Sequence, residues 1–429
     1  MIGYLTVSMV LVAFCMVAQR LSTTIITAPM VFLGFGALLS YSGIMPEVAS
    51  EEALHIVAEV TLVVLLFLDA AQINVGELRR RFTWPARMLL LGLPLAMIIG
   101  TVAGSILMPG IGLLGAALVA AILSPTDAAL GQPVVSNPAV PERPRRALIV
   151  ESGLNDGLAL PIIFMLAVAA APAATAPPEG WALYGIKQVT LGPLIGLAIG
   201  WVGAHVLLWA KRTEFTSDIY EGIGALALAG SAYLAASQIG GNGFIAAFCA
   251  GLAFGALVQG RCAFVFEFTE SEGQFLSWAS FLLMGIVLVP EAAAHLTLPM
   301  FALILTSLVI VRPLAIWLSL IGTDASPTTR LFFGWFGPRG LATALFALLV
   351  VEQLDHDLHH LILHTAINAV WISAVLHGVT AAPAARWYGR IMRARGDTGA
   401  MKPLPDGTIT GPVPAPTDTT TNVTAPKDT

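Results

Sequence analysis

The segment from about Ala147 to Ala171 is apolar and long enough to cross a lipid bilayer, yet it contains two acids, Glu151 and Asp156. An ionised carboxylate at the centre of a membrane helix costs about 2.5–3.5 kcal/mol even on lenient insertion scales. A chain that keeps such groups in hydrocarbon is expected to use at least one of them to hold an ion or a proton. The segment therefore predicts a membrane helix with a functional acid.

Composition places the rest of the chain in the membrane as well. Of the 429 residues, 57% are hydrophobic and only 11% are charged, whereas soluble domains are about one-quarter charged. The formal net charge is only −5, and no basic stripe with interleaved aromatic residues is present. We therefore expect an all-α polytopic membrane protein that contacts the lipid bilayer and binds no nucleic acid.

Apolar runs of about bilayer-spanning length predict thirteen transmembrane helices. They lie at roughly 2–18, 25–45, 53–70, 88–108, 111–130, 147–171, 186–210, 219–238, 243–259, 274–291, 297–318, 329–351 and 361–382.

The loops between these runs alternate in charge, which predicts the orientation. Every second loop is basic, from Arg20 to the arginines that follow the last run, and the others are acidic or neutral. The positive-inside rule places the C-terminus in the cytoplasm and the N-terminus outside. We expect a transmembrane domain over residues 1–395 and a disordered cytoplasmic tail over 396–429, which is rich in Pro, Thr, Asp and Gly.

Two of the predicted helices are interrupted at corresponding places. The fifth contains Ser-Pro-Thr-Asp at 124–127, and the twelfth contains Gly-Trp-Phe-Gly-Pro-Arg-Gly at 334–340. Proline and clustered glycines disfavour a continuous helix. Because the fifth and twelfth helices are seven apart, helices 1–6 and 8–13 are interpreted as two inverted six-helix repeats. Such paired interruptions indicate a transporter site near the midplane.

Polar residues gather on the sixth predicted helix. Ser152 and Asp156 are i,i+4 neighbours, and so are Glu151 and Asn155. Arg339, in the second interruption, needs a buried acid because its guanidinium stays charged. We predict that Glu151 pairs with Arg339, which leaves Asp156 free to titrate.

Hard oxygen ligands suit small cations rather than soft metals. We therefore predict a cage for an ion such as Na⁺, formed by Asp156, Ser152, Thr126 and a backbone carbonyl freed by Pro125. A single carboxylate that holds a proton and a cation in alternation can exchange one for the other.

Other polar residues carry alternative interpretations. Asp69, at the end of the third run, is equally compatible with an interfacial acid, and Arg312 is interpreted as a snorkelling residue. Four histidines invite a metal site but fall in a predicted outer loop, so we interpret them as loop residues: His356, His359, His360 and His364.

Five motifs together resemble the monovalent cation:proton antiporter-1 family, the bacterial relatives of sodium/proton exchangers. They are Ser-Pro-Thr-Asp at 124–127, Glu-Ser-Gly-Leu-Asn-Asp-Gly at 151–157, Gly-Asn-Gly-Phe-Ile-Ala at 241–246, Gly-Pro-Arg-Gly at 337–340 and Leu-His-Gly-Val-Thr-Ala at 376–381. The resemblance covers about residues 5–395. One departure is Pro125, which precedes Thr126 here but follows the aspartate in many relatives.

The resemblance implies a thirteen-helix homodimer that works by alternating access, with Asp156 as the shared proton and cation site. It implies supporting roles for Ser152, Asp69 and the Thr126 backbone. It also implies that Asp127 balances opposed half-helix ends. It further implies a Glu151–Arg339 pair with Asn155 hydrogen-bonded to it. An Asn before the Asp is associated in the family with electroneutral one-for-one exchange.

The expected activity is therefore exchange of Na⁺ or Li⁺ for H⁺ across a bacterial inner membrane, with K⁺/H⁺ exchange as the alternative. A cation channel would need repeated polar rings along a pore, whereas the acids here cluster at one depth. An intramembrane enzyme is disfavoured because no Ser and His fall in paired broken segments and no His-Glu-x-x-His motif occurs. We expect no enzymatic activity and no cofactor.

Overall fold

The computed structural model describes most of the chain. The described residues are 2–21, 24–43, 51–73, 83–135, 137–172, 180–259 and 261–395. All regular structure in this part of the chain is helical, which confirms the predicted fold class. The predicted tail at 396–429 lies outside the described residues.

The N-terminal half contains three apolar helices, a bent span, an interrupted span and a long polar-lined helix. In order they are α1 (Ile2–Leu21), α2 (Ala28–Ser42), α3 (Glu51–Ala71), α5 (Thr83–Arg87), the π-helical segment η1 (Met88–Gly92), α6 (Leu93–Leu107), the short 3₁₀ turn η2 (Pro109–Ile111), α7 (Gly112–Ile122), α8 (Ala128–Val135) and α9 (Glu142–Ala170).

The C-terminal half begins after the long connecting helix α10 (Trp181–Arg212). Its elements are α11 (Asp218–Gln238), α12 (Gly243–Val258), α13 (Ala263–Val287), α14 (Val289–Ala294), α15 (Leu298–Thr306), the π-helical segment η4 (Ser307–Val311), α16 (Arg312–Ser319), α17 (Pro327–Trp335), α18 (Leu341–Val351) and α19 (His356–Arg395).

Membrane-crossing character follows from length and apolarity. Within the described ranges, six helices are long and apolar enough to cross a membrane, and five more are apolar but shorter. The chain is therefore a multi-pass membrane protein. The count of thirteen spans stays a prediction.

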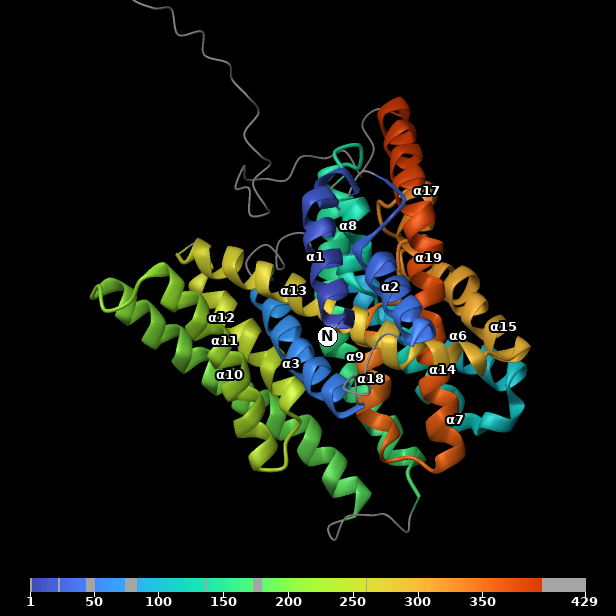
Figure 1. Cartoon of the computed structure of the whole chain (residues 1–429), viewed down its shortest axis with the longest axis horizontal. Helices are drawn as coiled ribbons and strands as arrows, with labels where there is room; N and C mark the ends of the chain where they lie inside the picture. Colours follow the sequence, from blue (N-terminus) through green and yellow to red (C-terminus); the bar gives the residue numbers. More distant parts are fainter. Residues whose placement is uncertain are drawn as a thin grey trace, which may run out of the picture.

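The helices form two packed groups, which Figure 1 shows side by side. In one group α12 packs on α3, α10 and α11, and α13 packs on α2 and α3. In the other, α6 packs on α7, α15 and α16. Helix α9 contacts α3 and α12 as well as α7, α8 and α18, so its polar residues lie between the groups.

Two π-helical segments repeat the internal symmetry that the interruptions predict. Segment η1 lies within the span Thr83–Leu107 and η4 within Leu298–Ser319. Each is followed by an α-helix whose second residue is proline, Pro94 or Pro313. Proline removes a backbone donor and crowds the preceding turn, and a widened π turn accommodates it.

Candidate functional site

Both predicted interruptions are confirmed, and they lie against each other. Helix α7 ends at Ile122 and α8 begins at Ala128, while α17 ends at Trp335 and α18 begins at Leu341. The Asp127 backbone N–H donates to the Pro338 carbonyl at 2.9 Å. The two non-helical segments therefore meet directly inside the protein.

Each interruption supplies a charged side chain to the helix end of the other. Asp127 Oδ2 accepts a 2.7 Å hydrogen bond from the N–H of Leu341, the first residue of α18. Arg339 Nη1 donates to the carbonyls of Ser124 and Pro125, each at 3.2 Å, just beyond the C-terminal end of α7. Because helix N-termini are partially positive and C-termini partially negative, both contacts are favourable.

Position 340 has room only for glycine, because Asp127 occupies the adjacent space. A Cβ atom at position 340 would overlap the Asp127 carboxylate. The glycine in the second interruption therefore permits the carboxylate of the first to reach the start of α18.

Thr126 is the centre of a buried polar cluster between the first interruption and α9. Its hydroxyl accepts a 2.6 Å hydrogen bond from Asn155 Nδ2. It also lies 3.3 Å from the Ser152 hydroxyl and donates weakly to Glu151 Oε2 at 3.4 Å. Both members of one predicted i,i+4 pair, Glu151 and Asn155, and one member of the other, Ser152, thus gather around a single threonine hydroxyl.

Asp156 lies one turn beyond Ser152 on α9, and it is an acid with a buried oxygen that accepts no hydrogen bond from the described residues. The residue is 9% exposed, and its Oδ1 atom has no hydrogen-bond partner among the described residues. Asp69, on α3, lies against Gly153 of α9. A proton or a cation at this carboxylate would offset its burial beside another acid.

The predicted Glu151–Arg339 ion pair is wrong, and the partner of Glu151 is Arg312. Arg312 Nη2 lies 3.1 Å from Glu151 Oε2, and both side chains are 4% exposed. Arg312 Nη1 and Nη2 also donate to Glu151 Oε1 at 3.2 and 3.1 Å. The interpretation of Arg312 as a snorkelling residue is therefore also wrong. Asn155 bonds Thr126 rather than an arginine.

The π-helical segment η4 and Gly337 account for the position of Arg312. Arg312 is the first residue after η4 and starts α16. A Cβ atom at Gly337 would overlap its side chain, and Arg312 Nη2 also donates to the Phe336 carbonyl at 3.4 Å. Arg312 therefore joins α16, α9 and the second interruption.

Arg339 is fully buried and held by α19. Its backbone N–H donates to Ser373 Oγ at 2.7 Å. Ser373 Oγ lies 3.1 Å from His377 Nδ1, and His377 Nε2 lies 3.0 Å from the Trp335 carbonyl. Sequence reasoning assigned no role to Ser373 or His377, although the motif at 376–381 contains the histidine.

Comparison with known proteins places this arrangement in context. The fold and polar cluster define a class of multi-pass membrane protein built around two interrupted helices whose non-helical segments touch. The model of the transmembrane sodium/hydrogen exchanger family matches residues 6–387, so the chain belongs to that family. This confirms the resemblance to cation:proton antiporters, a family of transporters rather than enzymes.

Several relatives share part of the chain. It is 27% identical over 384 residues to a K⁺/H⁺ antiporter, NhaP, of Alkalimonas amylolytica, covering 87% of this chain and 64% of the relative. It is 30% identical over 280 residues to a K⁺/H⁺ antiporter, NhaP2, of Shewanella oneidensis, covering 63% of this chain and 46% of that one. The chain thus spans about half to two-thirds of the length of these curated relatives.

A solved structure shares the fold. The sodium proton antiporter MjNhaP1 of Methanocaldococcus jannaschii, determined at pH 8, matches with a TM-score of 0.73 and 20% identity. The match covers 91% of this chain and 97% of that chain.

Proposed function

We propose that this protein exchanges Na⁺ or Li⁺ for H⁺ across the bacterial inner membrane by alternating access at Asp156. The observation that carries the proposal is the contrast between two acids on one helix. Glu151 is neutralised by Arg312, whereas Asp156 Oδ1 is buried without a hydrogen-bond partner among the described residues. One acid is structural, and the other is left to bind a proton or a cation in turn.

The proposed cation ligands are Asp156, Ser152 and Thr126, with Asp69 as a further oxygen from α3. All offer hard oxygen atoms, which suit alkali cations. The Ser152 and Thr126 hydroxyls already lie 3.3 Å apart. Asn155, Glu151, Arg339 and Asp127 hold this geometry without binding the cation.

K⁺ is the second candidate cation. The relatives from Alkalimonas and Shewanella are named as K⁺/H⁺ antiporters, and the structural neighbour as a sodium proton antiporter. Selectivity depends on cavity geometry rather than on ligand type alone.

Everted membrane vesicles test the exchange activity and its cation together. The vesicles are acidified by respiration, and the recovery of a quenched pH dye is followed after Na⁺, Li⁺ or K⁺ is added at several pH values. Saturable recovery with Na⁺ and Li⁺ supports the first candidate, and recovery with K⁺ alone supports the second. No cation-dependent recovery would contradict both.

The proposal also includes a homodimer whose N-terminus lies outside and whose C-terminus lies in the cytoplasm. The alternation of basic and acidic loops supports this orientation. The family resemblance supports the homodimer.

Loss of a secondary ligand should weaken cation binding more than turnover. We expect Ser152→Ala and Asp69→Asn each to raise the apparent KM for the cation several-fold, with a smaller change in maximal rate. Each change removes one oxygen ligand but leaves Asp156 to titrate. Dye recovery against cation concentration measures both parameters. An unchanged KM in Asp69→Asn would return that residue to the role of an interfacial acid.

Exchange is expected to be electroneutral, because one carboxylate trades one proton for one monovalent cation. Glu151 stays paired with Arg312, and Asn155 has no titratable proton. The mobile part of the protein then carries the same charge in both loaded states. Proteoliposomes with a cation gradient should change luminal pH without building a membrane potential.

A clamped potential provides the stricter measurement. Movement of net charge would couple to voltage at about 2.3 kcal/mol per elementary charge per 100 mV. The exchange rate should therefore be the same at clamped potentials of either sign. A rate that follows the potential would indicate a second titrating group, for which Asp69 and Asp127 are the candidates.

A further inference from the structure

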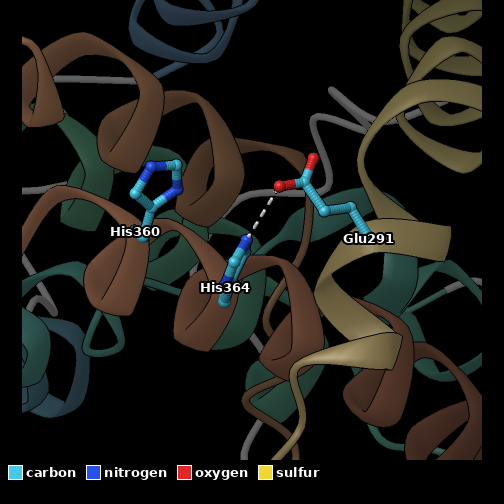
Figure 2. Close-up of side chains that lie close together, drawn as sticks. All are labelled: Glu291, His360 and His364. Atoms are coloured by element: carbon cyan, nitrogen blue, oxygen red, sulfur yellow. Dashed lines mark ion pairs between the residues drawn. The ribbon is translucent and has the colours of Figure 1, made fainter. Parts of the chain in front are cut away.

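A second group of ligand-type side chains lies away from Asp156, where α14 meets the start of α19. It consists of Glu291, His360 and His364, and we call it the α14–α19 cluster. One potential ligand atom from each residue lies within 4.8 Å of the others. Figure 2 shows Glu291 reaching from α14 toward His364 of α19. His360 lies one turn before His364 on α19. The expectation that these histidines lie in a loop is wrong, because α19 already begins at His356.

The cluster lines a cavity of about 350 Å³ that contains further donors. His295 and Asp357, both exposed, line the same cavity. The ring of His295 stacks on that of His364 with centroids 4.8 Å apart. His295 Nδ1 lies 2.9 Å from the Glu291 carbonyl oxygen. A histidine whose Nδ1–H bonds a backbone carbonyl has its Nε2 available for a metal, the usual arrangement at metal sites.

The geometry points to a binding site for a divalent transition-metal ion of the Zn²⁺ class, held by Glu291, His360 and His364, with His295 of the same cavity as a fourth ligand. Two imidazoles and a carboxylate are the donors that Zn²⁺, Cu²⁺ and Ni²⁺ prefer, whereas alkali and alkaline-earth cations prefer oxygen. His360 and His364 are i,i+4 neighbours on one face of α19. Glu291 comes from a different helix, so the ion would join two elements.

The distances require only side-chain adjustment. His364 Nε2 and Glu291 Oε1 are 3.5 Å apart. Ligand atoms of a tetrahedral Zn²⁺ site with Zn–N bonds of about 2.0–2.1 Å are separated by about 3.3 Å. The Glu291 side chain is half exposed and sits opposite the two histidines (Figure 2), so rotation of exposed side chains can close the remaining distance.

This site is separate from the proposed exchange site and does not rest on it. Ser373, which holds the second interruption through Arg339, lies nine residues beyond His364 on α19. At a rise of about 1.5 Å per residue this is about 14 Å along the helix. The ligand chemistry also differs, because the Asp156 cluster offers oxygens and no imidazole.

Metal binding to the purified full chain tests the inference. Chelator-treated protein in detergent is titrated with Zn²⁺ by calorimetry, and its thermal unfolding is followed with and without Zn²⁺. We expect one saturable site per protomer and a higher Tm with Zn²⁺, since an ion that binds the folded state stabilises it. Cu²⁺ should give an electron paramagnetic resonance spectrum with nitrogen hyperfine splitting from histidine.

Three variants locate the ligands. Glu291→Gln keeps the size of an exposed side chain and is expected to fold normally, whereas His364→Ala empties a buried position. Loss of a residue that only supports a metal ligand costs about 10–100-fold in metal affinity, and loss of a direct ligand should cost at least as much. Glu291→Gln should therefore weaken Zn²⁺ binding at least about tenfold. The double change His360→Ala with His364→Ala should do the same. The control is His205→Ala, which removes an exposed histidine on α10. This variant should bind Zn²⁺ as the parent protein does.

Two results would overturn the inference. One is an absence of saturable Zn²⁺ binding to the parent protein. The other is Zn²⁺ affinity and nitrogen splitting in Glu291→Gln and the double variant that match those of the parent, which would mean that adventitious surface histidines bind the ion.

Discussion

Asp156→Asn is expected to reduce cation/proton exchange to the background of empty vesicles while leaving the protein folded. The amide has nearly the same shape as the carboxyl group but cannot release a proton or balance a cation. Folding should be preserved because the change removes a buried ionisable group whose Oδ1 has no hydrogen-bond partner among the described residues. Dye recovery in everted vesicles measures exchange, and thermal unfolding in detergent measures folding.

Asp69→Asn is the matched control for this result. It removes a second acid of the same site but leaves the proposed titrating group intact, so exchange should continue at a higher apparent KM. If Asp156→Asn exchanged at a rate close to the parent protein, or if Asp69→Asn alone abolished exchange in a folded protein, the shared site would not be Asp156.

The interruptions could be predicted from sequence because their cause is local. Proline at 125 and the run of glycines and proline at 334–340 disfavour helix whatever surrounds them. The concentration of polar residues on α9 was visible for the same reason, because an acid in an apolar run is a local anomaly. The structure adds that the two interruptions touch, with the Asp127 N–H bonded to the Pro338 carbonyl.

The partner of Glu151 could not be predicted because it depends on tertiary packing. Arg312 and Glu151 are 161 residues apart, and no spacing rule relates them. The π turn of η4 and the missing side chain at Gly337 set the direction of Arg312. Arg339 was a reasonable candidate by charge, but its Nη1 binds backbone carbonyls instead.

The histidines near residue 360 were misplaced for a different reason. Polar residues at the end of an apolar run are typical of a loop, so the last span was predicted to begin at about 361. Helix α19 begins at His356, and helical spacing then places His360 and His364 on one face beside Glu291. The error in the helix boundary left His360 outside the predicted helix and so separated it from His364.

Arg312→Ala is expected to destabilise the protein by about 3–5 kcal/mol, the usual cost of removing one member of a buried ion pair. The loss should be large because Glu151 would remain buried, at 3% exposed, without its cation. Thermal or denaturant unfolding in detergent measures the change. Exchange should fall in parallel, because Arg312 also contacts the second interruption through the Phe336 carbonyl.

Neutralising Glu151 distinguishes the Glu151–Arg312 pair from the Glu151–Arg339 pair that the sequence suggested. Glu151→Gln should recover part of the stability lost in Arg312→Gln, because the double variant leaves no unpaired charge, and coupling between contacting residues is about 0.5–3 kcal/mol. The same Glu151→Gln change should recover much less in an Arg339→Gln background, where the lost hydrogen bonds are those to the Ser124, Pro125 and Gly337 carbonyls. Additive losses for Glu151 with Arg312, or equal rescue of both arginine variants, would contradict the assignment.

Selective rescue of the Arg312 variant would mean that Glu151 is a fixed structural charge. Asp156 would then be the acid of α9 that is free to exchange a proton for a cation.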